Sequence, residues 1–223
     1  MRRRRADAIL FKCHAPLPAP DRIVEGLAQL QQLPVAAVTV NLGLDGAELY
    51  AYLWLREAAE VGSGPLAQAV ALAFAGGAVD AAWLVRLQDI RGASYGATTE
   101  FHYVVETDVA PEAEGDLNEW YNNEHLPGLA AVPGAIRAQR LLNLDGAPRY
   151  HSCYDLVTQE TLAAAPWLAV RHTAWSDRIR PSFRNTKRTM FRRVAELAPP
   201  GARPSLSGAA ALNRTGSSSR RRR

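Results

Sequence analysis

The sequence of 223 residues predicts an α+β fold made of two consecutive βαββαβ units. Three observations support this prediction. Strand-like and helix-like hydrophobic periods follow one another in the same order in each half of the chain. An Asp-Gly pair, typical of a tight hairpin, lies between two predicted strands at Asp45-Gly46 and again at Asp145-Gly146. The two halves have similar lengths of roughly 90 residues, so the sequence indicates a tandem repeat.

The first unit is predicted over residues 6–92, after an Arg-rich start at residues 1–5 that we expect to be disordered. Asp21 is expected to cap its first helix, Pro65 to begin the second, and Gly76-Gly77 to end it. The predicted elements are a strand at 6–14, a helix from 21 to 33, strands at 35–42 and 48–56, a helix at 66–74 and a strand at 79–87.

The second unit is predicted over residues 99–195, followed by a tail at 196–223. The Pro, Gly, Ser and Arg content of this tail cannot offset its ordering entropy, which predicts disorder. Asp116 is expected to cap the opening helix and Pro127 to end it. The predicted elements are strands at 99–109, 135–142, 149–156 and 184–194, and helices at 116–126 and, interrupted at Pro166, 160–178.

The order βαββαβ is that of the ferredoxin-like split βαβ unit, in which both helices cover one face of a four-stranded sheet. In that arrangement we expect the strands at 99–109 and 149–156 to be adjacent and parallel at the centre of the second sheet. The other face of each sheet stays bare. Two such faces can close against each other, so that one chain forms a pseudo-dimeric α/β barrel; further homodimerisation is allowed but not required.

The composition is that of an ordinary globular protein, with 48% apolar and 22% charged residues. The formal charge of +4 depends on Arg2–Arg5 and Arg220–Arg223, without which 18 basic residues face 22 acidic ones. This slightly acidic remainder argues against specific nucleic-acid binding. No apolar run approaches the roughly 20 residues of a membrane span, and no signal-peptide core is found. We therefore expect a cytoplasmic protein with no membrane partner.

Sequence motifs for metal, cofactor and covalent chemistry are missing. Cys13 and Cys153 fall in predicted strands and are expected to be buried free thiols. No two histidines have the local spacing of metal ligands, and neither a dinucleotide or phosphate loop nor a G-x-S-x-G motif is found. We expect no metal and no cofactor.

The stretch DLNEWYNNEHLP, Asp116–Pro127, concentrates reactive side chains in one short helix. Tyr121 and His125 are four residues apart and share a face, while Trp120 and Glu124 share the adjacent face. Either Tyr121 and His125 face a ligand, or the two aromatic residues anchor the helix to the sheet and His125 is solvated. The sequence leaves both interpretations open.

The segment WYNNEHLPGLAAVPGAIRAQR resembles the motif [WF]-Y-x-x-x-H-x-P, followed by P-G, of the dimeric α/β-barrel superfamily, in particular of EthD-like proteins. RYHSCYDL and TAWSDRIRPSFRNTKRTMF are similar to later parts of the same proteins, so the resemblance covers residues 99–194. It implies the barrel fold, and a small organic ligand that is bound or converted in the barrel lumen. It also implies a functional role for His125.

A second set of candidates follows from period-two alternation in the strands. His102 and Glu106 share one face of the first strand of the second unit, and His151 and Asp155 share one face of the strand beside it. Two imidazoles and two carboxylates on one lumen wall could exchange protons near neutral pH. Alternatively, either histidine is a hydrogen-bonded core residue or lies at an exposed strand end.

Two further candidates precede the last strand. The resemblance places a Trp and an Arg here, so Trp175 could form an apolar wall and Arg178 could clamp a substrate carboxylate. Alternatively, Arg178 only favours the negative end of its helix.

The sequence-based hypothesis is a cofactor-independent enzyme of isomerase, cyclase or monooxygenase type that moves a proton on a small organic molecule. His125 or His102 would be the base, Tyr121 would bind a substrate oxygen, and Trp120 would form a wall of the pocket. The alternative is a noncatalytic small-molecule-binding or assembly module, because the first unit lacks the Y-x-x-x-H-x-P motif. A haem- or oxygen-using relative is a third option.

Overall fold

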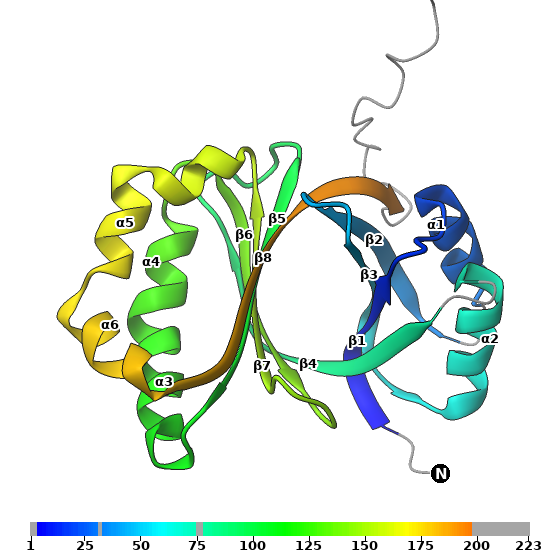
Figure 1. Cartoon of the computed structure of the whole chain (residues 1–223), viewed down its shortest axis with the longest axis horizontal. Coiled ribbons are helices and arrows are strands. Elements are labelled where there is room, and N and C mark those ends of the chain that lie inside the picture. Colours follow the sequence, from blue (N-terminus) through cyan, green and yellow to red (C-terminus); the bar gives the residue numbers. More distant parts are fainter. Residues whose placement is uncertain (1–3, 31–32, 75–77, 198–223) are drawn as a thin grey trace, which may run out of the picture.

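The structure is a computed structural model that describes residues 4–30, 33–74 and 78–197. Within these residues, eight antiparallel strands close into one barrel, and the helices lie on its outside (Figure 1). The predicted α+β class is confirmed. In the described part of the chain, no helix is long and apolar enough to cross a membrane.

The N-terminal half supplies four strands and two helices. They are β1 (Arg4–His14), α1 (Pro20–Ala28), β2 (Val35–Gly43), β3 (Glu48–Val61), α2 (Ser63–Phe74) and β4 (Val79–Arg91). As the Asp-Gly turn predicted, β2 and β3 form an antiparallel hairpin, in which Gly46 has a φ of 72°.

The C-terminal half supplies four strands and a longer helical layer. Its elements are β5 (Phe101–Val109), η1 (Pro111–Ala113), α3 (Glu114–Trp120), η2 (Tyr121–His125), α4 (Leu126–Ala130), β6 (Ala135–Asn143), β7 (Tyr150–Leu156), η3 (Gln159–Ala163), α5 (Ala165–Arg171), α6 (Ala174–Ile179), η4 (Arg180–Ser182) and β8 (Phe183–Leu197).

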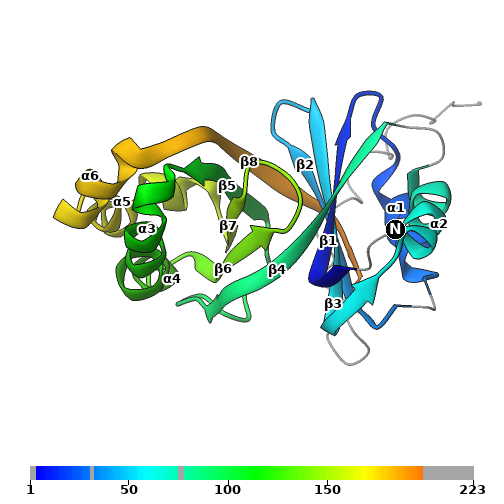
Figure 2. The same cartoon turned by 90° about the horizontal axis from the view of Figure 1, so that it is seen from below.

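Around the barrel the strands follow the order β1-β3-β2-β8-β5-β7-β6-β4. The N-terminal half thus forms the arc β4-β1-β3-β2 and the C-terminal half the arc β8-β5-β7-β6. The arcs join where β2 pairs with β8 and β4 with β6. Helices α1 and α2 cover the first arc from outside and α3 to α6 cover the second (Figures 1 and 2).

The prediction that the strands at 99–109 and 149–156 run parallel is wrong. They correspond to β5 and β7, which are adjacent but antiparallel. The chain returns through a helix before β6, so β6 runs in the same direction as β5, and the hairpin then reverses β7. The resulting register pairs His102 with Asp155 and Glu106 with His151.

Several predicted boundaries need correction. Arg4 and Arg5, expected to be disordered, pair with β3, and β8 continues to Leu197 beyond the predicted start of the tail. Asp21 lies in the first turn of α1, which begins at Pro20 and has Ala19 at its N-cap. Gly76-Gly77, residues 1–3 and residues 198–223 lie outside the described residues.

Three hydrophobic clusters hold these layers together. One lies between the first arc and α1 and α2, another between the second arc and α3 to α6, and the third fills much of the barrel interior. Interior side chains include Leu10, Tyr52, Leu141 and Phe191, which come from both halves. Sequence alternation therefore sorts each strand between an outer, helix-covered face and an inner face.

Candidate functional site

The helix that carries the Y-x-x-x-H-x-P motif does not end at Pro127. It runs from Glu114 to Ala130 as α3, η2 and α4, with a single π-helical turn at Tyr121–His125. In that turn the amide of Leu126 donates to the carbonyl of Tyr121, five residues back. A π turn widens the helix, which lets it accommodate Pro127, a residue without an amide hydrogen. Isolated π turns of this kind are frequent at functional sites.

Asp116 does not cap this helix, because the helix has already begun at Glu114. Its carboxylate instead accepts hydrogen bonds from Trp175 Nε1, at 2.8 Å, and from Arg178 Nη2, at 3.1 Å. Trp175 and Arg178 therefore connect α6 to α3 on the protein surface, where the Arg178 side chain is 62% exposed. They do not line the cavity beside His125, so the substrate-binding role predicted for them is not part of that cavity and stays a prediction.

A cavity of about 30 Å³ lies between this helical layer and the outer face of the second arc. Aromatic side chains form most of its wall, and three arginines lie around it. Its lining comprises Tyr103, Val105, Trp120, Tyr121, His125, Leu129, Tyr154, Trp167, Arg171, Arg180, Phe183 and Arg188. We refer to this site as the helix-side pocket.

Two buried polar atoms in the helix-side pocket have no hydrogen-bond partner in the described structure: His125 Nδ1 and Tyr154 Oη. The His125 ring stacks on Trp120, with ring centroids 4.0 Å apart, and meets Tyr121 edge-on at 5.4 Å. The imidazole is therefore fixed by its aromatic neighbours. Because buried polar groups are normally paired, these two free atoms indicate room for a polar ligand.

The electrostatic environment keeps His125 neutral. Burial, followed by the nearby Arg180 and Arg171, lowers its pKa to about 3. Burial has the opposite effect on phenols and raises the pKa of Tyr154 and Tyr121. Near neutral pH the pocket thus offers an uncharged imidazole and phenol groups that remain hydrogen-bond donors.

Three arginines give the helix-side pocket a positive charge. Within the described residues, no ion pair or side-chain hydrogen bond joins Arg171, Arg180 or Arg188 to a carboxylate. Burial, followed by the nearby Arg171 and Arg188, lowers the pKa of Arg180, whereas the carboxylate of Asp177 acts in the opposite direction. Three guanidinium groups with one nearby carboxylate, that of Asp177, leave an excess of positive charge that favours an anionic ligand.

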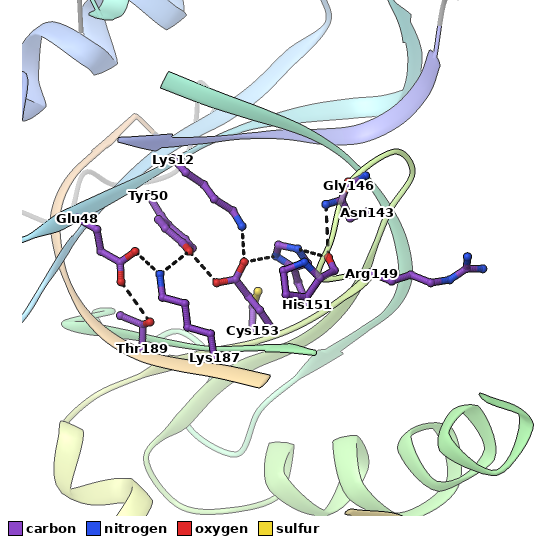
Figure 3. Close-up of polar contacts among 12 residues, drawn as sticks. Lys12, Glu48, Tyr50, Asn143, Gly146, Arg149, His151, Cys153, Lys187 and Thr189 are labelled. Carbon is purple, nitrogen blue, oxygen red and sulfur yellow. Dashed lines mark hydrogen bonds and ion pairs between the residues drawn. The ribbon is translucent and has the colours of Figure 1, made fainter. Parts of the chain in front are cut away.

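The second set of predicted residues lies on the opposite face of the same sheet, inside the barrel. Figure 3 shows Lys12, Tyr50 and His151 converging there from different strands. Lys12 and Tyr50 donate to the carboxylate of Glu106, the latter at 2.7 Å, and His151 Nδ1 lies 3.7 Å from it. Glu106 is 1% exposed, and His151, Lys12 and hydrogen bonds outweigh its burial and lower its pKa. This group joins the two halves through an internal ion pair.

His102 and Asp155 form a neighbouring inner pair. His102 Nδ1 lies 2.8 Å from Asp155, whose carboxylate also accepts from Arg193 Nη2 at 2.8 Å. The other ring nitrogen of His102 lies 3.4 Å from the hydroxyl of Tyr52. Burial lowers the pKa of His102, whereas Arg193 and His102 hold the pKa of Asp155 at about 2. These groups are fully partnered, which fits the core interpretation of His102.

The structure thus separates the predicted site residues into three groups. Trp120, Tyr121 and His125 meet in the helix-side pocket, whereas His102, Glu106, His151 and Asp155 lie on the barrel side of the sheet. The sheet stands between them, so His125 and His102 cannot act on one substrate together. Trp175 and Arg178 form the third group, on the surface.

Residues that the sequence did not single out complete the helix-side pocket. Tyr103 and Tyr154 come from the helix-facing side of β5 and β7, Trp167 from α5, and Arg188 from β8. Strand alternation assigns both tyrosines to the helix-covered face but gives no reason to prefer them over other residues there. In the described part of the chain, no cluster of three or more His, Cys, Asp and Glu side chains has a metal-binding arrangement.

No family model and no curated protein matches this sequence. Similar solved structures include a candidate monooxygenase from Fusobacterium nucleatum, with a TM-score of 0.60 and 11% identity over 88% of this chain and 96% of that one. A candidate monooxygenase from Lactobacillus acidophilus has a TM-score of 0.56 and 11% identity, covering 87% of this chain and 96% of its own. An anthrone oxidase-like protein has a TM-score of 0.52 and 13% identity, covering 90% and 95%. At these identities the likeness shows a shared ferredoxin-like α/β-barrel fold.

Proposed function

We propose that this chain is a tandem-repeat, EthD-like barrel protein that acts as a cofactor-independent enzyme on a small, planar organic acid. The helix-side pocket would be its active site. The observation that carries this proposal is the conjunction of two free buried polar atoms, His125 Nδ1 and Tyr154 Oη, with three unpaired arginines. The solved structures described as monooxygenases and anthrone oxidase-like proteins are compatible with this class of chemistry.

The proposed step is a proton transfer. An acidic C–H or O–H group of the substrate would give its proton to His125 Nδ1, and the electron pair left behind would move onto a conjugated oxygen. Tyr154 would donate a hydrogen bond to that oxygen, and Arg180 and Arg171 would stabilise its negative charge. Return of the proton to another atom of the same conjugated system completes an isomerisation. In a cyclisation, the carbanion would instead attack a carbonyl carbon of the same molecule, the carbonyl π pair would move onto its oxygen, and His125 would return the proton to that oxygen. A monooxygenase reaction would require dioxygen as an additional reactant.

The low pKa of His125 in the free protein is compatible with this role. Burial and two arginines disfavour its protonated form. An anionic substrate oxygen beside the ring would offset the arginines and raise the pKa of His125 in the complex. The base would therefore become stronger when the correct ligand is bound.

The size of the cavity sets a further requirement. A volume of about 30 Å³ accommodates little more than water, so an aromatic ring needs additional space. The arginine side chains are the groups that can move, because Arg188 is exposed and Arg171 and Arg180 are half-buried. We propose that these side chains swing outward on ligand entry and then contact the acidic group.

Hydrogen–deuterium exchange of a bound substrate tests the chemistry. Aromatic and polyketide-like acids would first be screened by thermal shift, and exchange at the acidic C–H of the hits would be followed by NMR. We expect His125→Gln to retain binding within a few-fold and to lose exchange by roughly 100-fold or more, the usual contribution of a general base. Arg180→Gln should weaken binding, whereas the surface variant Arg178→Gln should match the wild type. Unchanged exchange in His125→Gln would disprove the catalytic role.

A noncatalytic binding module is the second candidate, and the small cavity and the densely packed barrel interior favour it. The same series separates the two functions. Binding that depends on Arg180 but is never accompanied by proton exchange would support a binding module. Exchange that depends on His125 would support an enzyme.

A further inference from the structure

A groove of about 660 Å³ runs along the outer surface, between the start of the motif helix and the ends of β4, β6 and β7. Both polar and apolar side chains line it. Leu87, Leu142 and Pro111 provide apolar surface, whereas Arg140, Arg149 and the amides of Asn118 and Asn122 provide polar groups. The groove shares no lining residue with the helix-side pocket.

Arg140 is the unusual residue of this groove. It is only 1% exposed, and its guanidinium carbon lies 4.4 Å from the ring centre of Tyr121 and 4.4 Å from that of Tyr150. Its Nε and Nη2 atoms are buried without a hydrogen bond in the described structure. The two rings cover the faces of the guanidinium, so its N–H groups, which point outward in its plane, can still donate hydrogen bonds. Such a group suits the oxygens of a carboxylate or a phosphate.

The acidic group nearest to Arg140 is already engaged. Glu114 accepts a hydrogen bond from the hydroxyl of Tyr150 at 2.5 Å and pairs with Arg149 Nε at 3.1 Å. The Arg149 side chain is 56% exposed and can turn toward a ligand in the groove. Two arginines therefore face one carboxylate, and the buried one has no counter-ion.

We propose that this groove is a second ligand site, which binds the carboxylate or phosphate group of a small molecule through Arg140. Arg149 and the Asn118 and Asn122 amides complete the polar end of the site, and Leu87 and Leu142 contact the apolar part of the ligand. The proposal does not depend on the function assigned to the helix-side pocket, because the two sites share no lining residue and meet only where Arg140 packs on the ring of Tyr121.

The test follows the arginine Nε–H resonances of the full-length protein by NMR during titration. Inorganic phosphate and benzoate are the two anionic probes, and benzylamine is the cationic control. We expect a saturable shift of the Arg140 resonance with at least one anion and none with benzylamine; the responding anion distinguishes the phosphate from the carboxylate class. The resonance is assigned from its loss in Arg140→Lys. The resonance of the exposed Arg178, which lies outside the groove, is the control for shifts caused by added salt alone.

Gly115 provides a matched pair of variants that leave Arg140 in place. It lies in the groove on α3, and an added Cβ would meet no atom within 4 Å. Gly115→Ala should bind the anion as the wild type does, whereas Gly115→Asp adds a negative charge and should weaken binding by about tenfold or more. An Arg140 resonance that does not respond to either anion, or responds no differently from Arg178, would overturn the proposal. Equal binding by Gly115→Ala and Gly115→Asp would also count against it.

Discussion

Three histidines of the C-terminal half are buried and uncharged at neutral pH. Burial lowers the pKa of His125 to about 3, that of His151 to about 4, and that of His102 below its usual range. In the unfolded chain each would bind a proton near its ordinary pKa of about 6.5. Between these values the unfolded state binds more protons, so the folded state loses stability as the pH falls from about 6.5 toward 3 to 4.

The contribution of His125 can be isolated by substitution. At about pH 4.5 the unfolded chain binds a proton at His125 and the folded chain does not. This difference should lower the free energy of unfolding by roughly 2.5 kcal/mol relative to pH 7.5, from the pKa difference and 1.36 kcal/mol per pKa unit. His125→Gln should remove this part of the pH dependence, measured by urea unfolding at both pH values. The exposed His172→Gln is the control and should leave the dependence unchanged. Identical slopes in the wild type and His125→Gln would contradict the burial argument.

The ion pair between Lys12 and Glu106 lies inside the barrel, so removal of one partner leaves the other charge poorly solvated. Glu106→Gln leaves the Lys12 ammonium without a counter-charge, so we expect a loss of roughly 3 kcal/mol in the free energy of unfolding. Combining it with Lys12→Met should recover part of this loss, because the unpaired charge is then removed. Glu114→Gln, at a pair that is partly exposed to water, should cost less than about 1 kcal/mol. Equal losses at Glu106 and Glu114 would show that burial is not decisive.

At the scale of elements, the π turn decides where the motif side chains point. The amide of Leu126 reaches back to Tyr121, so the carbonyl of Asn122 lacks its usual partner. Gln88 Nε2, from the neighbouring β4, donates to that carbonyl at 3.2 Å. The extra residue of the turn is thus accommodated both by Pro127, which needs no acceptor, and by a side chain from another element.

Deleting the exposed Asn123 tests this explanation. A regular helix would then place Pro127 in its interior, where its ring clashes with a carbonyl of the preceding turn at a cost of about 3 kcal/mol. We expect the deletion to lower stability by this order and to impair ligand binding in the helix-side pocket. Adding Pro127→Ala should restore much of the stability, measured by thermal unfolding, but not the binding. A deletion that is neutral on its own would show that the π turn is not required by Pro127.

At the scale of the whole molecule, closure of the barrel depends on two seams. One is the pairing of β2 with β8 and the other is that of β4 with β6. Side chains also cross between the halves, as when Arg193 donates to Asn41 at 2.7 Å and Lys187 pairs with Glu48. Each half alone would expose two strand edges and an apolar inner face, which favours association.

Separate expression of residues 4–92 and 99–197 tests the proposed tandem organisation. If each half is a repeat unit with one bare face, neither should be a stable monomer, and the two should form a 1:1 complex when mixed. Sedimentation and circular dichroism would measure association and folding. An intact chain cut only between residues 92 and 99 is the control and should remain associated. A folded, monomeric C-terminal half would contradict the role assigned to the seams.

The sequence by itself determined which elements form and which face of each strand is covered, because hydrophobic periods and turn residues act over short distances. It therefore predicted the element order, the hairpins, and the shared face of Tyr121 and His125. The antiparallel direction of β7 against β5 also follows from the element order, so the parallel prediction was an error of reasoning and not a limit of the sequence. The sequence could not determine the separation of His102 from His125, because this depends on contacts between distant segments. The lack of a hydrogen bond at Nε and Nη2 of Arg140 in the described structure was likewise decided only when the tertiary structure assembled its surroundings.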